Sequence, residues 1–515
     1  MTDRLQRVST GVPGLDEVLD GGLVAGRSYL VRGPPGSGKT VLGYHFLTEG
    51  VAAGERALFV NLEEDEAAAR ANAASLGFDL DDVAVLDLSP SSEFFAEDQS
   101  YSVFASDEVE SDDFTERIAD RVAALEPDRV FVDPVTQFRY LTSDDYQFRK
   151  QVISFMRFLE EQDATVMFTS QGGADASDLD LQFVSDGIVE LAHDGDRRSI
   201  SVPKFRGSDK RSGRHGLVIR GDGLHVYPQL VPDDHRAGFT TEPIPSGIDE
   251  LDALLGGGIE RGTISVISGP TGVGKSTTGT QFVAEAARRG ERSAVYLLEE
   301  SAATFRHRSE SIGIPVDEME AEGTLAVEEV EPLALSPEEF ASRVRREVEQ
   351  RDTRVVMIDG IQGYRVSIQG EHDELVRKLH ALGRYLKNVG VTVVFVDEID
   401  TVTGEFRATN AGISYLADNV VYLRYLEIEG ELRKVIGVLK KRVGDFERTL
   451  RAFAITGEGI VVGDPLTGLG GVLRGEPEFV DSEGRNERDV PSGVRSDPGT
   501  TGERERGDPG DDRVE

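Results

Sequence analysis

The chain repeats itself once, and this repeat constrains its fold more than any other feature of the sequence. TGVPGLDEVLDGGLVAG from Thr10 aligns with SGIDELDALLGGGIERG from Ser246, an offset of 236 residues. The same offset relates GPPGSGKT from Gly33 to GPTGVGKS from Gly269. A long repeat of this kind predicts two copies of one domain, and a chain of 515 residues gives each copy enough length to bury its own core.

Each copy alternates short β-branched runs with longer amphipathic stretches. The runs are SYLVR, RALFV, RVFVD and TVMFT in the first copy, and TISVI, SAVYL, RVVMI and VTVVF in the second. This alternation predicts the α/β class, with a mainly parallel sheet flanked by helices. The later pairs GIVEL with RSISV, and VVYLRYLEIEG with LRKVIGVLK, predict an antiparallel edge hairpin in each copy.

Composition changes mark the domain boundaries. We predict domains over residues 1–238 and 239–477, joined by the Pro-rich stretch from Pro228 to Pro245. From about Gly475 the sequence is charged and glycine-rich with few large apolar groups, so residues 478–515 are expected to be a disordered acidic tail. The stretch from Pro90 to Asp113 has a similar character and occurs in the first copy only.

The balance of charge is strongly acidic, with 94 Asp and Glu against 56 Lys and Arg. A dense carboxylate surface keeps a protein hydrated at high salt, so we expect a halophilic archaeon as the source; the alternative is an ordinary acidic protein with a disordered tail. The chain has no cysteine, which excludes disulfides and thiolate chemistry, and its eight histidines lack metal-ligand spacing. Because no apolar run is long enough to span a bilayer and the start is polar, we expect a cytoplasmic protein without a membrane partner.

The motif GxxxxGK[ST] occurs twice, each time between a β-run and an amphipathic stretch. Its glycines let the backbone curl so that N–H groups and a helix N-terminus point at one phosphate, while the lysine reaches the terminal phosphates of ATP. The predicted nucleotide-binding residues are Gly33, Pro34, Pro35, Gly36, Ser37, Gly38, Lys39 and Thr40, and then Gly269, Pro270, Thr271, Gly272, Val273, Gly274, Lys275 and Ser276.

Two kinds of carboxylate accompany these loops. Asp133 and Asp359 end apolar runs, where each carboxylate, together with Thr40 or Ser276, can hold Mg²⁺; the alternative is an aspartate that caps the next turn. The pairs Glu63–Glu64 and Glu299–Glu300 follow the next β-run in each copy. A carboxylate there can orient and deprotonate the attacking water, so we interpret each pair as a catalytic base with a second, tuning carboxylate; the alternative is a solvated helix face.

The ordered set of motifs, TGVPGLDEVLDGGL, GPPGSGKT, LEE, VDPVT and then KxR, each repeated once, resembles the KaiC family of RecA-like ATPases. The resemblance runs from about Ser9 to about Pro477. It implies two tandem RecA-like P-loop domains, a homo-hexamer of two stacked rings, and ATP bound between neighbouring subunits. Carried over by position, the resemblance makes four residues the fingers that reach the neighbour's γ-phosphate: Lys204, Arg206, Lys440 and Arg442. Lys210, Arg211 and Arg214 fit better as a basic rim.

The resemblance also implies serine/threonine autokinase activity in the second domain. Ser414 in ATNAGISYLADNVVYL falls on the family's acceptor serine and Thr409 on a minor site, but Tyr415 replaces the acceptor threonine. This departure puts a two-site phosphorylation cycle in doubt. The alternative for Ser414 is an ordinary loop or helix-cap serine.

We therefore interpret the sequence as a ring-forming ATPase that uses ATP and Mg²⁺, and that switches shape for signalling protein partners. The rivals are a DNA-dependent RecA relative and a nucleotide-locked scaffold with little turnover. The sequence has no basic, aromatic-rich loop of the kind that grips single strands, and its acidity argues weakly against a nucleic-acid partner.

Overall fold

The structure is a computed structural model, and it divides the chain into two compact units. The described residues are 5–89, 117–141, 145–171, 178–195, 197–232, 242–368, 372–399, 414–428, 430–470, 472 and 478–479. The larger unit spans residues 1–402 and 407–465 and holds both copies of the repeat, called here the first lobe (to residue 232) and the second lobe (from residue 242). In the smaller unit, β23 (Leu469–Gly470) pairs with β24 (Glu478–Phe479). The predicted segment Pro90–Asp113 and most of the acidic tail lie outside the described residues.

The main sheet of the first lobe has the strand order β11-β10-β9-β8-β3-β7-β6-β4-β5 within the described residues. The six strands β8-β3-β7-β6-β4-β5 are parallel to one another. Strands β9, β10 and β11 then extend the sheet from β8, and each is antiparallel to the strand before it. The strands are β3 (Ser28–Gly33), β4 (Ala57–Asn61), β5 (Ala84–Asp87), β6 (Arg129–Asp133), β7 (Thr165–Gln171), β8 (Gly187–Asp194), β9 (Arg197–Phe205), β10 (His215–Arg220) and β11 (Gly223–Tyr227). A separate ladder joins β1 (Arg7–Val8) to β2 (Leu23–Val24).

The second lobe repeats this topology strand for strand, with the order β16-β15-β17-β18-β14-β19-β20-β21-β22. Its strands are β14 (Ile264–Gly269), β15 (Ser293–Leu297), β16 (Leu325–Glu329), β17 (Val355–Asp359), β18 (Thr392–Glu398), β19 (Asn419–Ile428), β20 (Glu431–Lys441), β21 (Arg451–Thr456) and β22 (Gly459–Pro465). The small ladder recurs as β12 (Pro243–Ile244) with β13 (Ile259–Glu260).

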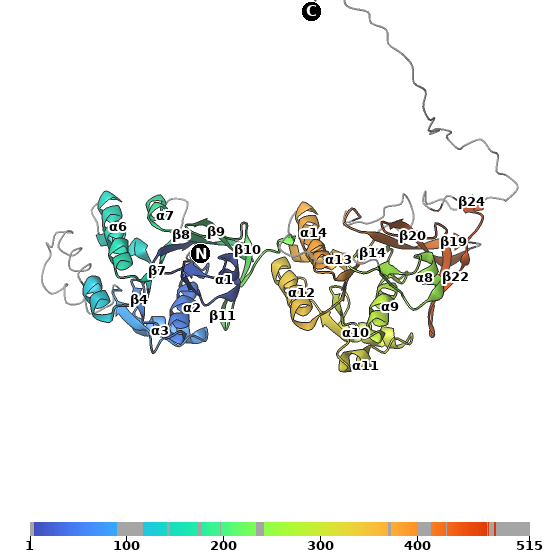
Figure 1. The fold of residues 1–515 in the computed structure, drawn as a ribbon, viewed down its shortest axis with the longest axis horizontal. Coiled ribbons are helices and arrows are strands. Elements are labelled where there is room, and N and C mark those ends of the chain that lie inside the picture. Colours follow the sequence, from blue (N-terminus) through green and yellow to red (C-terminus); the bar gives the residue numbers. More distant parts are fainter. Residues whose placement is uncertain are drawn as a thin grey trace, which may run out of the picture. The chain divides into compact units, whose positions relative to one another are not determined.

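Helices cover both faces of each sheet (Figure 1). The first lobe contains the helices α1 (Pro13–Val18), α2 (Lys39–Ala52), α3 (Glu66–Ser75), the 3₁₀ helix η1 (Val135–Leu141), α6 (Asp145–Glu161) and α7 (Leu179–Val184), and residues 117–125 are also helical. Those of the second lobe are α8 (Asp249–Leu254), α9 (Lys275–Arg288), α10 (Ala302–Glu310), α11 (Val316–Ala321), α12 (Pro337–Arg351), α13 (Ile361–Ile368) and α14 (His372–Asn388).

Side chains along the central strands alternate between two buried cores. In β3, Val31 packs in the cluster that contains Phe46 of α2, whereas Leu30 packs in the cluster that contains Phe155 of α6. In β14, Ile267 and Val266 divide in the same way between clusters of the second lobe. A strand buried on both faces reads as a continuous apolar run, which is why the sequence showed these strands clearly.

The predicted fold class is confirmed, since each copy of the repeat is a mainly parallel sheet flanked by helices and extended by an antiparallel hairpin. The sequence did not reveal the second hairpins, β10–β11 and β21–β22, because β10 is buried only in its first half and β21 is mostly exposed or half-buried, so neither gives a long apolar run. Among the described residues, no helix is both long and apolar enough to cross a membrane.

Candidate nucleotide site

The predicted phosphate loop of the first lobe joins β3 to the start of α2. The helix begins at Lys39, directly after Gly38, which has a left-handed φ of 105°. A Cβ atom at Gly38 would lie 2.8 Å from Cδ1 of Ile219 in β10, so both the backbone conformation and the space require glycine. The loop therefore curls so that the first N–H groups of α2 are presented together, which suits a phosphate.

The second lobe builds the same loop between β14 and α9. Gly274 has a φ of 116°, and a Cβ atom there would lie 2.7 Å from Cδ1 of Ile455 in β21. In each lobe the second antiparallel hairpin thus packs against the last glycine of the phosphate loop. Sequence reasoning missed this contact because the packed residues are about 180 positions apart along the chain.

The lysine of each loop is buried and folds back onto the loop carbonyls. The Lys39 ammonium donates to the carbonyl oxygens of Gly33 (2.9 Å) and Pro34 (3.1 Å), and that of Lys275 donates to the carbonyl oxygen of Pro270 (2.9 Å). Burial lowers the pKa of both lysines, and nearby carboxylates oppose this shift. In the second lobe the first of these carboxylates is Glu398, whose Oε2 lies 3.6 Å from the Lys275 Nζ.

A hydroxyl and a buried aspartate meet beside each loop. Thr40 donates to Oδ2 of Asp133 (2.6 Å), and Ser276 donates to Oδ1 of Asp359 (3.0 Å). Thr169 of β7, a residue that sequence reasoning missed, donates to the other oxygen of Asp133. Burial raises the pKa of Asp133, against the hydrogen bonds of Thr169 and Thr40, and burial raises the pKa of Asp359 to about 6.

These hydroxyl–carboxylate pairs fit Mg²⁺ bound together with a nucleotide. Mg²⁺ usually takes one or two protein oxygens and completes its octahedron with water and phosphate. Among the described residues, no group of three or more His, Asp or Glu side chains is arranged to hold a metal ion. The buried Ser37 hydroxyl, which has no hydrogen-bond partner within the described chain, adds a polar group inside the first loop.

The first glutamate pair directly follows β4. Burial raises the pKa of Glu63, as do Asp133 and Glu64, while Lys39 lowers it. Glu63 comes two residues after Asn61, which pairs with Asp133 across β4 and β6, so it follows the same end of the sheet as this aspartate. A carboxylate with a raised pKa is a better base for water than an ordinary surface glutamate. Glu64 turns to α3, and its Oε2 accepts a hydrogen bond from the side-chain amide of Asn72 (2.7 Å).

The second pair follows β15 and has different neighbours. Glu299 accepts a hydrogen bond from the backbone N–H of Gly363 (2.9 Å), and a Cβ atom at Gly360 would lie 2.7 Å from the Glu299 Cγ. Both oxygens of Glu300 are bound by the guanidinium of Arg308, at 2.7 and 3.2 Å. Arg308 was not among the predicted residues.

The predicted fingers lie away from the phosphate loop of their own lobe. Lys204 in β9 pairs with Ile188 in β8, which pairs with Leu30, three residues before Gly33. The second lobe repeats this register, from Lys440 through Val420 to Val266, three residues before Gly269. Three residues of strand separate the two places by about 10 Å along the sheet. Each pair therefore sits toward the edge where its parallel strands begin, opposite the edge that carries the loop.

Each finger pair holds the turn that precedes its neighbouring strand. Lys204 donates to the carbonyl oxygens of Gln182 (2.7 Å) and Ser185 (2.6 Å) in the first lobe. The Arg206 side chain is 57% exposed and lies 3.6 Å from Asp186. In the second lobe, Arg442 is 49% exposed and lies 3.3 Å from Asp418, so both guanidinium groups face solvent in this chain.

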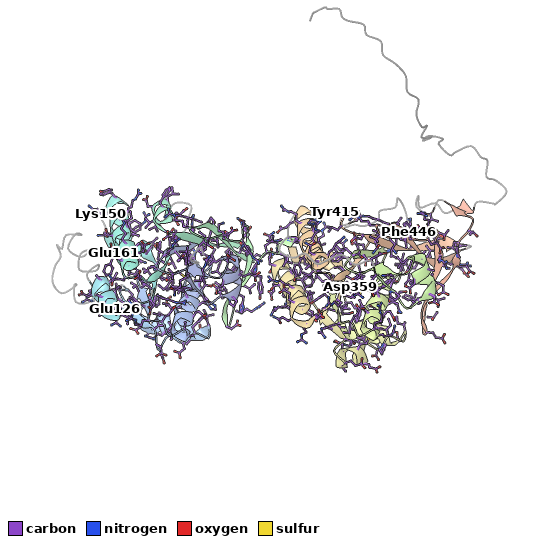
Figure 2. All side chains as sticks on the ribbon, viewed as in Figure 1. Glu126, Lys150, Glu161, Asp359, Tyr415 and Phe446 are labelled. Carbon is purple, nitrogen blue, oxygen red and sulfur yellow. The ribbon has the colours of Figure 1, made fainter. Side chains whose placement is uncertain are left out.

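Ser414 lies in the turn before β19, at the same edge as Lys440 and Arg442. Its carbonyl oxygen accepts a hydrogen bond from Lys440 Nζ (2.9 Å), and the next carbonyl, of Tyr415, accepts one from Arg442 (2.9 Å). The exposed ring of Tyr415, labelled with Asp359 in Figure 2, stacks on His380. Thr409 lies outside the described residues.

The rest of the basic cluster divides in two. Arg211 pairs with Glu17 (2.8 Å), as a basic rim residue would. Arg214 instead lines a cavity of about 490 Å³ together with Arg32, Gly33 and Pro34, beside the first phosphate loop. Sequence spacing gave no signal for this placement, which depends on β9 and β10 folding back beside β8.

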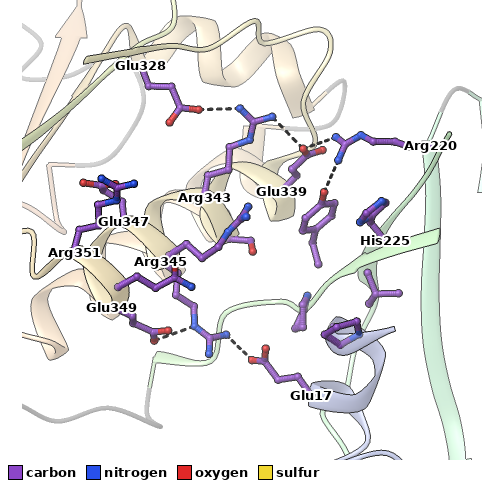
Figure 3. Close-up of a pocket in the computed structure, with 18 residues that line it drawn as sticks. Glu17, Arg220, His225, Glu328, Glu339, Arg343, Arg345, Glu347, Glu349 and Arg351 are labelled. Atoms are coloured by element: carbon purple, nitrogen blue, oxygen red, sulfur yellow. Dashed lines mark hydrogen bonds and ion pairs between the residues drawn. The ribbon is translucent and has the colours of Figure 1, made fainter. Parts of the chain in front are cut away.

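A larger cavity of about 810 Å³ lies beside β10, β11 and α12 and is rich in arginine and glutamate (Figure 3). Arg220 donates to Oε1 of the buried Glu339 (2.6 Å), and Arg343 binds the same oxygen (3.2 Å). Arg345 bridges Glu17 and Glu349. Since glutamates already pair with these guanidinium groups, this cavity is less suited to phosphate than the two loops are.

Comparison with known proteins decides the family. A family model described as "ATPase: KaiC" matches the chain twice, over residues 8–231 and 244–467. The chain belongs to the KaiC family. It is therefore a P-loop ATPase that binds nucleotide, and its two lobes are two KaiC domains.

The curated KaiC relatives match along nearly their whole length. The "Circadian clock protein KaiC3" of Synechocystis sp. is 28% identical, covering 93% of this chain and 96% of that protein. The "Circadian clock oscillator protein KaiC" of Parasynechococcus marenigrum is 27% identical, covering 94% and 95%.

Proposed function

We propose that this KaiC-family ATPase assembles with copies of itself so that each bound ATP is completed by the Lys-x-Arg pair of a neighbouring subunit. The observation that carries the proposal is the placement of Lys204 and Arg206 at the sheet edge opposite their own phosphate loop, with the same placement for Lys440 and Arg442. A pair that cannot reach its own site, yet keeps an exposed guanidinium, is suited to a site in trans. A homo-hexameric double ring is carried over from the family resemblance.

In the proposed hydrolysis, Glu63 and Glu299 orient water and take its proton as the water oxygen bonds to the γ-phosphorus. The bond between that phosphorus and the β–γ bridging oxygen breaks, ADP leaves, and the proton passes on to phosphate. Lys39 and Lys275 hold the phosphates, while the neighbour's arginine offsets charge on the transferred group, an effect of about 10³-fold or more in rate. Mg²⁺ held at Thr40 with Asp133, and at Ser276 with Asp359, supplies charge neutralisation when bound.

We further propose that Ser414 accepts a phosphoryl group from ATP bound to a neighbour. The serine Oγ would take the place of water, its proton would pass to Glu299 of the site that holds the ATP, and ADP would leave. The support is positional, because Ser414 shares its edge with Lys440 and Arg442, which would approach that same ATP.

The output of this cycle is a conformational state that signalling proteins in the cytoplasm read. The support is that the relatives of the chain are named as circadian clock proteins. Hydrolysis that depends on a neighbour couples the nucleotide state of one subunit to the assembly of the ring, which suits a switch better than a processive motor.

The test is incubation of the full chain in high salt with Mg²⁺ and γ-labelled ATP, following both released phosphate and label on the chain. We expect released phosphate together with label on Ser414, and expect the label to disappear in Ser414→Ala and in Lys440→Ala. Released phosphate without label would limit the protein to hydrolysis. If intact rings yield neither released phosphate nor label, this result would contradict the ATPase proposal and favour the nucleotide-locked scaffold.

A further inference from the structure

The two nucleotide sites differ at the second glutamate of the pair. In the first lobe, one oxygen of Glu64 accepts a hydrogen bond from the neutral amide of Asn72 (2.7 Å). In the second lobe, Arg308 binds both oxygens of Glu300, through Nη2 (2.7 Å) and Nε (3.2 Å). Asn72 and Arg308 occupy the same position of the repeat, 236 residues apart. A neutral partner in one lobe is thus a cation in the other.

The second lobe also contains an anchor that fixes this cation. Nη1 of Arg308 donates to the hydroxyl of Thr277 (2.9 Å), the residue after the Mg²⁺ candidate Ser276. The position equivalent to Thr277 in the first lobe is Val41, which has no hydroxyl. The guanidinium is therefore held by three hydrogen bonds to α9 and the β15–α10 turn, whereas in the first lobe the corresponding contact is the hydrogen bond from Asn72 to one oxygen of Glu64, and Val41 cannot supply a hydroxyl.

The physical consequence follows from charge and geometry. A bidentate guanidinium–carboxylate pair is charge-assisted and rigid, so it fixes the orientation of Glu300 and cancels its negative charge. The field of Arg308 also reaches Asp359, since this guanidinium favours the charged form of the buried Asp359 carboxylate. In the first lobe the uncancelled charge of Glu64 strengthens Glu63 as a base. In the second site the charge of Glu300 does not strengthen Glu299 as a base in this way, because Arg308 neutralises Glu300.

We propose that Arg308 is a positioning residue that makes the second site hydrolyse ATP more slowly than the first. The inference rests on the proposed function, namely that both sites hydrolyse ATP with their glutamate pairs. Nucleotide binding remains intact at both sites, because Arg308 contacts neither the phosphate loop glycines nor Lys275. The slow second site then holds ATP for longer, as a phosphate donor requires.

The experiment measures each site within the full chain. A background that carries Glu63→Gln and Glu64→Gln silences the first site, so the remaining phosphate release belongs to the second. Adding Arg308→Asn should raise the kcat of this background about tenfold, the effect of restoring one useful charge beside a general base, with little change in KM. The reciprocal change, Asn72→Arg with Val41→Thr in a Glu299→Gln, Glu300→Gln background, should slow the first site by a similar factor.

Arg306→Asn is the matched control, because Arg306 lies on the same helix but pairs with Glu320 away from the nucleotide site. Arg306→Asn should leave the rate unchanged. Arg308→Lys keeps the positive charge but cannot bind both oxygens of Glu300 in the bidentate way of a guanidinium, so its kcat should lie between that of Arg308→Asn and that of the background with Arg308. An unchanged kcat in Arg308→Asn, with fluorescent-ADP affinity and ring assembly retained, would overturn the inference alone. An unmutated chain that releases no phosphate would instead overturn the proposed function on which it rests.

Discussion

Acidification should loosen the contact between the P-loop helix and the hairpin that closes on it, through His45. This side chain lies on α2, and its Nε2 accepts a hydrogen bond from the backbone N–H of Leu224 in β11 (2.8 Å). Burial lowers the pKa of His45 to about 4, a shift that His225 reinforces and Asp222 opposes. Protonation would put a donor where the contact needs an acceptor, so the native state resists it.

The sign and size follow from linkage. Between the unfolded pKa of about 6.5 and the folded pKa of about 4, the unfolded chain binds more protons, so stability falls as the pH falls through this window. From pH 7.5 to pH 5 the loss is about 2 kcal/mol before screening. The ring is partly exposed, so about 1 kcal/mol is the expected loss, or about fivefold in the opening of the hairpin.

Hydrogen exchange of peptides that cover β11 measures this opening. The measured quantity is the exchange rate of the unmutated chain divided by that of His45→Gln. This ratio should be about fivefold higher at pH 5 than at pH 7.5, because the glutamine keeps an acceptor but does not titrate. His193→Gln, at an exposed position of β8, is the control and should behave like the unmutated chain. The reasoning is refuted if His45→Gln and the unmutated chain keep the same ratio at both pH values.

Two further predictions concern the first site. Gly38→Ala should weaken ATP binding at least about tenfold, since it combines a left-handed φ with a clash against Ile219. Gly54→Ala is the control: with a φ of 80° and open space around its Cβ, it should cost only about 1 kcal/mol of stability. Calorimetric titration compares the ATP affinities of the two variants, and equal affinities would contradict the packing argument. Thr169→Val removes one of the two hydroxyl donors to Asp133, so the pKa of Asp133 should rise further. The Mg²⁺ concentration that gives half the maximal ATPase rate should then increase about tenfold. An unchanged Mg²⁺ requirement would show that this aspartate is not the metal-binding group.

The features that sequence analysis predicted are the local ones. The phosphate loops, the strand that ends at Asp133 and the glutamates after β4 each depend on a short run of residues, and the repeat shows each of them twice. The central strands were equally clear, because burial on both faces gives a continuous apolar run such as RVFVD.

The features that it missed depend on pairing between distant segments. Thr169 reaches Asp133 only because β7 lies beside β6, and Ile219 meets Gly38 only because the second hairpin folds over the loop. Arg308 lies in AATFRHRSE, which reads as a solvated helix, and its hydrogen bonds to Glu300 and Thr277 distinguish it from Arg306, which pairs with Glu320. Comparison of the two copies at position 72 and position 308 was the one available signal.

The central claim is that the Lys-x-Arg pairs complete the nucleotide site of a neighbour, and mixed assemblies test it most directly. One chain carries Lys39→Ala and Lys275→Ala and so cannot hold phosphate, while the other has all four fingers replaced by alanine, at Lys204, Arg206, Lys440 and Arg442. Each chain alone should release almost no phosphate, whereas co-purified mixed rings in equal proportion should regain about a quarter of the unmutated rate, because one in four interfaces then pairs an intact loop with intact fingers. Mixed rings that stay as inactive as either parent, with both chains demonstrably present, would contradict the account.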